Sequence, residues 1–254
     1  MPRASPRQNF HSSNLIRILS DLALVDTCYP GHAFAEELGL WLNLDDAITL
    51  HALHAEGASV TVTRSGPTEK APLAEQFTRL RADMATVELP GEATHLSRNR
   101  VGKPPAAGDV PMAAAASYEP YRRVYSAHQR EMEAKIRPFR LQVREVLART
   151  SPRLAKLAAL DAVFDKSIFE RERQLLSMLP ALMAKRFEEL RQTHHQSLDV
   201  TPDPVDSVSS CQSVAWLTRF RQELQAVLLA ELDTRLEPTL GLIEAYNLEI
   251  SQLS

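Results

Sequence analysis

Residues 159–176 read ALDAVFDKSIFERERQLL, and their apolar spacing is that of a long amphipathic helix. At about 100° per residue, the acidic side chains of Asp161, Asp165 and Glu172 lie within roughly 40° of one another, on the apolar side of this helix. Carboxylates in such a position act as metal ligands, as acid–base groups, or as ion-pair partners of a neighbouring helix. The architecture of the rest of the chain decides among these roles.

The composition is that of a helical protein with one sizeable core or two small ones. The chain has 254 residues, of which 44% are hydrophobic and 24% charged, so wholesale disorder is not expected. Glycine is scarce, with eight residues, and convincing strand-like alternation is limited to VTVTR at residues 60–64. The sequence therefore predicts an all-α fold and excludes a parallel-sheet enzyme.

Cysteine usage and hydropathy both indicate a cytoplasmic protein. Cys28 and Cys211 are far apart and lack metal-ligand spacing, so we expect reduced thiols rather than a disulfide framework. No run approaches the roughly eighteen apolar residues that span a bilayer. The basic N-terminus is not followed by the continuous apolar core of a signal peptide. We therefore expect no transmembrane segment.

The first part of the chain predicts a small helical unit followed by a linker. Residues 1–57 contain three short amphipathic segments that we expect to pack as helices around Trp41. Residues 58–117 read as a linker with one amphipathic helix, over 69–88. The part from 89 to 116 is rich in proline, glycine and alanine, and we expect it to be flexible or disordered.

Residues 118–254 predict an elongated helical hairpin followed by an acidic C-terminal helix. Apolar side chains keep to one stripe over 118–149, and Ser151 is placed to cap the start of the next helix. We expect that helix to reach about His195, with a kink at Pro180. At 1.5 Å per residue, the two arms would be roughly 45 and 65 Å long.

The C-terminal segment predicts a third helical layer. Residues 197–210 are rich in proline, serine and aspartate and read as a second linker. A helix is expected from about Cys211 to Leu236. Pro238 is expected to kink or end it, with a terminal helix possible beyond.

Charge is segregated along the chain. Residues 118–196 carry sixteen basic and ten acidic side chains, whereas residues 197–254 carry three basic and nine acidic ones. A basic hairpin attracts nucleic acid or an acidic surface. The interpretation we favour is that the hairpin packs against the acidic ends of the same chain.

The same asymmetry bears on the acids of residues 159–176. The side chains of Arg122, Arg140 and Arg144 flank the apolar stripe of the preceding helix. A half-buried carboxylate normally needs such a partner, because an unpaired buried charge costs several kcal/mol. We therefore predict an interhelical ion-pair network of these arginines with Asp161, Asp165 and Glu172.

A carboxylate metal site in a helical bundle is the alternative. Such a site uses Glu-x-x-His pairs on facing helices. The one Glu-x-x-His in the sequence is Glu92–His95, inside the proline-rich segment. The pattern is incomplete, so we predict no metal, no other cofactor and no catalytic residue.

Aromatic residues give a second set of candidate positions. Their spacing of three and four residues is what helix packing produces, so core or interface burial is favoured over base stacking. The set comprises Trp41, Tyr118, Tyr121, Tyr125, Trp216 and Phe220.

Four stretches carry a resemblance to a known family: SSNLIRILSDLAL (12–24), FAEELGLWLNLDDAITLHAL (34–53), YEPYRRVYSAHQREMEAKIRPFR (118–140) and a segment from LAALDAVFDKS to MAKRFEELR (157–191). The chain resembles the uncharacterised proteobacterial family called domain of unknown function 3348. The resemblance covers most of the chain apart from the two linkers. It brings no activity and no catalytic residues. It implies a cytoplasmic accessory to an envelope-associated assembly, because genes of the family lie near genes for MotA-like and OmpA-like envelope proteins.

These observations predict a non-enzymatic helical scaffold that acts by protein–protein association, including self-association through amphipathic helices. One alternative is a nucleic-acid-binding module that uses the basic hairpin over 118–196, although we do not expect a nucleic-acid partner. Another is a carboxylate-metal helical-bundle enzyme. No small-molecule substrate can be identified from the sequence.

Overall fold

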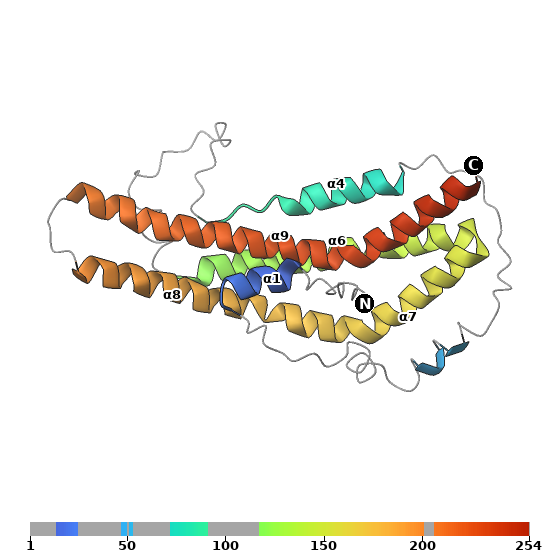
Figure 1. Ribbon diagram of the computed structural model, residues 1–254, viewed down its shortest axis with the longest axis horizontal. Helices are drawn as coiled ribbons and strands as arrows, with labels where there is room; N and C mark the ends of the chain where they lie inside the picture. The colour runs from blue at the N-terminus through green and yellow to red at the C-terminus, as the bar shows by residue number, and fades with distance from the viewer. Residues whose placement is uncertain are drawn as a thin grey trace, which may run out of the picture. The chain divides into compact units, whose positions relative to one another are not determined.

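The computed structural model describes residues 14–24, 47–49, 51–52, 72–90, 117–200 and 206–253. Within these ranges the regular secondary structure is helical and contains no strand, which confirms the all-α prediction. Figure 1 shows the helices α1 (Asn14–Asp21), α4 (Leu73–Ala85), α6 (Glu119–Thr150), α7 (Pro152–Ser177), α8 (Leu179–Val200) and α9 (Asp206–Leu253).

The chain divides into two compact units, each assembled from segments that are distant in the sequence. Among the described residues, unit 1 contains α1, residues 86–90, α6 up to Arg130, α8, and α9 up to Glu231. Unit 2 contains α4, the remainder of α6, α7, and the remainder of α9. Each unit thus has its own set of packed helical segments.

Unit 1 has an apolar interior formed by α6, α8 and α9, and α8 runs beside the first half of α9 (Figure 1). Leu89, just after α4, is only 4% exposed, and the carbonyl of Pro90 accepts a hydrogen bond of 3.2 Å from the Tyr121 hydroxyl. The prediction that residues 89–116 are flexible or disordered is therefore wrong for Leu89 and Pro90, because the large apolar side chain of Leu89 is buried.

Unit 2 has two adjoining apolar clusters. One joins Val143 and Leu147 of α6 to Leu154 of α7 and Leu242 of α9. The other joins Met84 of α4 to side chains of α6 and α9. The helix predicted within 69–88 is confirmed as α4, and its apolar side chains contribute to both clusters.

The turn between α6 and α7 follows its sequence signal. The Ser151 hydroxyl accepts a hydrogen bond of 3.2 Å from the Leu154 N–H, and Pro152 is the first residue of α7. A serine at this position satisfies a backbone donor that lacks an intrahelical partner, and proline has no N–H to leave unsatisfied there. The predicted cap is confirmed, and it fixes the start of α7.

Three prolines of the long helices have different consequences. Pro138 and Pro238 lie inside α6 and α9, which remain continuous. The kink expected at Pro180 is present as a short break at Met178: α7 ends at Ser177 and α8 starts at Leu179, so the segment forms two helices rather than one. Pro180 cannot donate to the carbonyl four residues earlier and its ring clashes there, whereas it fits the first turn of a new helix.

The expected linker over 197–210 is largely wrong. Helix α8 extends to Val200 and α9 begins at Asp206. Aspartate and serine disfavour helix interiors but suit a first turn, where they stabilise unpaired N–H groups and the positive end of the helix dipole. The composition of this segment was therefore compatible with the start of α9.

Several predictions fall outside the described residues, namely the second N-terminal helix with Trp41, the strand-like run at 60–64 and most of the segment 89–116. The division into 1–57, 58–117 and 118–254 consequently stays a prediction. None of the described helices combines the length and the apolar composition that a membrane crossing requires.

Candidate functional site

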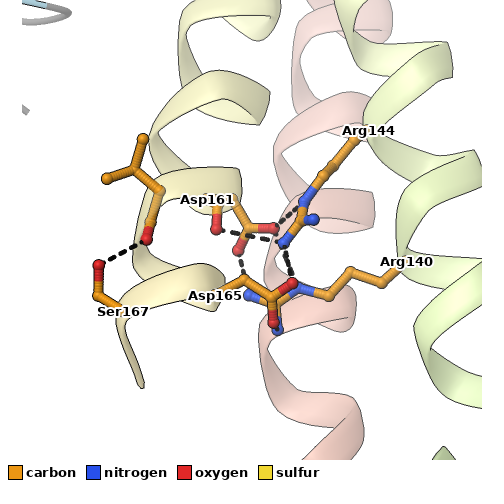
Figure 2. Close-up of polar contacts among 6 residues, drawn as sticks. Arg140, Arg144, Asp161, Asp165 and Ser167 are labelled. Carbon is orange, nitrogen blue, oxygen red and sulfur yellow. Dashed lines mark hydrogen bonds and ion pairs between the residues drawn. The ribbon is translucent and has the colours of Figure 1, made fainter. Parts of the chain in front are cut away.

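The acids of the opening stretch meet two arginines of α6 inside unit 2. Figure 2 shows the side chains of Arg140 and Arg144 pointing from α6 toward Asp161 and Asp165 of α7. We call these four residues the Arg–Asp clamp. Their side chains are only 10–20% exposed, so the clamp is a largely buried group of four formal charges.

The hydrogen bonds of the clamp cross-link the two helices. Arg140 donates to both oxygens of Asp161, from Nε at 3.0 Å and from Nη2 at 2.5 Å, and its Nη1 donates to Asp165 at 2.9 Å. Arg144 donates from Nε to Asp161 at 2.6 Å and lies 3.0 Å from Asp165 through Nη2. Each carboxylate is thus held by both guanidinium groups.

The local sequence explains this geometry. Residues four apart lie on the same face of a helix, so Arg140 and Arg144 share a face of α6, as Asp161 and Asp165 share a face of α7. The turn at Ser151 lies about midway between the two pairs along the chain. A short helix–helix connection makes the two helices antiparallel neighbours, which brings both pairs to the same level.

The clamp has little capacity for metal chemistry. Both carboxylates already accept charged hydrogen bonds from two arginines, and a cation would have to displace them. Among the residues that the structure describes, no group of three or more His, Cys, Asp or Glu side chains is arranged to hold a metal ion. The contacts of Asp161 and Asp165 are those of a structural cross-link.

One predicted member of the network, Arg122, lies elsewhere. Arg122 is in unit 1, where it donates to Glu119 at 2.8 Å. It precedes Arg140 by eighteen residues, which is roughly 27 Å of helix axis. Its place in the predicted network is therefore wrong, because a nearer carboxylate lies one turn away on its own helix.

Glu172 lies beyond the clamp on α7, where it lines a cavity of about 50 Å³ with Arg140 and Asp165. The Arg137 guanidinium lies over the Phe169 ring in the same lining, 4.6 Å from its centroid. The volume is far below the roughly 300 Å³ of a typical small-molecule site. This cavity therefore suits ordered water rather than an organic ligand.

The predicted aromatic residues of α6 and α9 gather inside unit 1. Phe187 of α8 lies at the centre, with ring centroids 5.0 Å from Phe220, 5.3 Å from Trp216 and 6.0 Å from Tyr121. Tyr118 also contacts this cluster, and its hydroxyl donates to the Pro180 carbonyl at 2.7 Å. Burial raises the pKa of Tyr118. Edge-to-face packing of this kind stabilises a core.

A fully buried carboxylate lies beside the aromatic side chains of unit 1. Glu231 of α9 is 0% exposed, and it accepts hydrogen bonds from the Tyr125 hydroxyl at 2.8 Å and from Gln129 at 3.0 Å. Tyr125 was predicted as a core or interface position, and the structure places it in the core. Its hydroxyl gives the buried acid one of the partners that it needs.

A second interhelical arginine–carboxylate contact joins α8 to α9 in unit 1. Arg186 donates from Nε and Nη2 to the two oxygens of Glu223, at 2.8 and 2.9 Å, and Arg219 donates to the same carboxylate at 2.9 Å. Burial works to raise the pKa of Glu223, but hydrogen bonds from both arginines outweigh it, so this pKa lies below its usual value. Glu223 is thus held as an anion.

Comparison with known proteins identifies the family of this chain. The model of a family described as a protein of unknown function, DUF3348, matches residues 1–248. The chain belongs to this family. No curated protein and no solved structure matches the chain. Membership of DUF3348 therefore carries no activity or catalytic residues to these positions.

In this DUF3348 protein, three residues make central contacts that the sequence did not predict. They are Phe187, Glu223 and Glu231. Phe187 continues an apolar stripe with Met183 and Leu190, so its burial could have been read from spacing. Glu223 and Glu231 carried no comparable signal, because their partners on other helices lie 37 and 106 residues away.

Proposed function

We propose that the chain is a non-enzymatic helical scaffold that acts by binding other proteins through the exposed faces of its helices. The observation that carries the proposal is the Arg–Asp clamp. The acids that most resembled a chemical site, Asp161 and Asp165, each contact both Arg140 and Arg144. Their contacts hold a helix pair together, which is what a scaffold requires.

The distribution of ion pairs supports protein association over nucleic-acid binding. In unit 1, Glu223 of α9 pairs with Arg186, and in unit 2 Glu249 of α9 lies 3.8 Å from Arg153. The acidic C-terminal helix thus contacts part of the basic charge of residues 118–196 in both units. Nucleic-acid binding depends on arginine and lysine side chains that are free to reach phosphate groups.

Exposed apolar side chains supply contact area for a protein partner. Leu175 of α7 is 59% exposed, and Leu141 of α6 and Leu248 of α9 are 48% and 61% exposed. Large apolar side chains at a surface contribute to the buried centre of an interface. We extend the proposal to the cytoplasmic side of an envelope-associated assembly on the ground of the family resemblance alone.

Affinity purification of the full chain from its source cell, at its native expression level, tests the proposal. We expect a protein partner in a fixed stoichiometric ratio, identified by mass spectrometry and able to re-form the complex from purified components. A chain without a protein partner that instead binds nucleic acid, with affinity falling steeply as salt rises, would contradict the scaffold.

The metal alternative is tested in the same preparation by elemental analysis of the wild type and of Asp161→Ala. The scaffold predicts no stoichiometric metal in the wild type and a loss of stability in the variant. Stoichiometric metal that disappears in Asp161→Ala without unfolding would support the enzyme instead. Glu170→Ala, on an exposed position of the same helix, is the matched control.

A further inference from the structure

One face of α9 in unit 2 is exposed along about three helical turns, from Glu237 to Leu248. It carries Glu237, Gly241 and Glu244, which we call the acidic stripe, and these residues lie within about 60° of one another. Leu240 and Leu248 border the stripe and are 39% and 61% exposed. Neither Glu237 nor Glu244 has an ion-pair partner among the residues that the structure describes.

No contact within unit 2 explains why residue 241 is a glycine. A Cβ added at this position would meet no atom within 4 Å, so the packing of unit 2 does not require a glycine there. Glycine inside a helix lowers stability relative to alanine, because its backbone loses more conformational freedom on folding. A glycine does, however, let a second helix approach the backbone closely, as small residues do at helix–helix contacts.

A complementary face lies on α6 in unit 1. Arg123, Ala127 and Arg130, which we call the basic stripe, are all exposed and also lie within about 60° of one another. Arg123 donates to Glu119 at 3.0 Å, and Arg130 donates to the Ser126 carbonyl at 3.2 Å. Exposed contacts of this kind contribute little to stability, so both guanidinium groups can exchange them for another partner.

The two stripes have the same spacing. In each stripe the small residue lies four positions after the first charged residue, as Ala127 follows Arg123 and Gly241 follows Glu237. The second charged residue, Arg130 or Glu244, lies three positions further on. Two helices aligned in parallel would set arginine opposite glutamate at both ends and alanine opposite glycine between them. Pairing of the acidic stripe with a second acidic stripe would oppose like charges.

We propose that the chain self-associates, with the basic stripe of one copy packed on the acidic stripe of another. The inference rests on the proposed function and names both the surface and the partner. The small residues allow the close approach, the two arginine–glutamate pairs set the register, and Leu240 and Leu248 add apolar contact. Because the two surfaces differ, the contact is heterologous, and its geometry decides whether it closes into a ring or continues as a chain.

Analytical ultracentrifugation of the full chain over a concentration series tests the proposal, with two charge-reversed variants. One variant carries Glu237→Arg and Glu244→Arg, and the other carries Arg123→Glu and Arg130→Glu. Each variant faces like charges in contacts with its own copies. We expect each to self-associate at least about tenfold more weakly than the wild type.

Mixing the two variants is the decisive experiment. Every contact between unlike variants is again of opposite charge, so the mixture should associate more strongly than either variant alone. Association of the wild type should also weaken as salt is raised, because the paired charges lie at the surface.

Lys166→Glu with Lys185→Glu is the matched control, since it changes the net charge as much as the basic-stripe variant does, at exposed positions on other helices. This control should associate like the wild type, and circular dichroism should show that all variants are folded. A monomeric wild type, or charge-reversed variants that associate normally, would overturn the inference. So would a mixture that does not associate. A monomer that still retains a stoichiometric protein partner would overturn the inference and leave the scaffold proposal standing.

Discussion

Unit 1 and unit 2 both cross-link neighbouring helices with arginine and carboxylate groups, but they differ in what surrounds the contact. In unit 2, Asp161 and Asp165 share two arginines, all four side chains being 10–20% exposed. In unit 1, Glu223 pairs with Arg186, which is 15% exposed, and with Arg219, which is 64% exposed. The carboxylate in unit 1 thus has one well-buried partner where those in unit 2 have two.

Unit 1 also contains a cluster of packed aromatic rings beside its aliphatic side chains. Phe187 and Phe220 pack edge to face, and Phe220 and Tyr121 are 0% exposed. Unit 2 holds its helices with aliphatic clusters beside the clamp. From this difference we infer that ion pairs contribute more to the alignment of the helices in unit 2, and ring packing more in unit 1. Substitutions in the two units should therefore lower the free energy of unfolding for different reasons.

The largest effect is expected from Phe220→Ala in unit 1. Removal of a fully buried ring should lower the free energy of unfolding by about 3–5 kcal/mol, because it leaves a cavity and removes contacts with Phe187 and Tyr121. Urea unfolding followed by Trp216 fluorescence, in a Trp41→Phe background, measures it. Lys185→Ala, exposed on α8, should change stability by less than about 0.5 kcal/mol.

A similar but smaller loss is expected from Asp161→Ala in unit 2. The substitution leaves Arg140 and Arg144 with Asp165 alone, and breaking a buried pair costs about 3–5 kcal/mol. We expect the lower end of this range, since Asp165 still satisfies both arginines in part. Urea unfolding followed by far-ultraviolet circular dichroism measures the change. An effect no larger than that of Glu170→Ala would mean that ion pairs do not hold this helix pair.

The two arginines of Glu223 should differ sharply. Arg186→Ala removes two hydrogen bonds to a buried carboxylate and should cost about 2 kcal/mol, whereas Arg219→Ala should cost less than about 0.5 kcal/mol because its side chain is exposed. The same fluorescence-detected unfolding separates the two variants. Equal losses of stability in the two variants would show that the exposure of each arginine does not determine how much its contact with Glu223 contributes.

The smallest effect is a pH dependence in unit 1. The pKa of Glu223 is lowered in the folded chain, so its ion pairs stabilise the fold above the unfolded pKa, near 4.5, and this contribution is lost as pH falls through the folded pKa. The difference in unfolding free energy between wild type and Glu223→Gln should be constant above about pH 5 and shrink below it. A difference that grew on acidification would have the wrong sign for a depressed pKa.

The sequence predicted the parts of this architecture that depend on local spacing. The all-α class, α4, and the capped turn at Ser151 follow from periodicity and from a single hydroxyl. The four clamp residues illustrate the same point. Arg140, Arg144, Asp161 and Asp165 border apolar stripes on consecutive helices joined by a short turn, so their proximity could be inferred before the structure was known.

The parts that escaped prediction depend on competition or on distant partners. Arg122 borders the same stripe as Arg140, yet Glu119 lies one turn away and binds it. The kink was predicted at Pro180, but the break falls two residues earlier, at Met178, because the steric clash of a proline ring falls on the preceding turn. Glu231 is buried, and no local pattern in the sequence names Tyr125 as its partner.

The central claim is that the acids of α7 are structural partners of α6, and a double-mutant cycle tests it most directly. The free energies of unfolding of wild type, Arg144→Ala, Asp161→Ala and the double variant give the coupling between two groups that lie 2.6 Å apart. We predict a coupling of at least about 1 kcal/mol, so that the double variant loses less than the sum of the single losses. Additive losses would show that the two side chains do not stabilise each other, and would contradict the account.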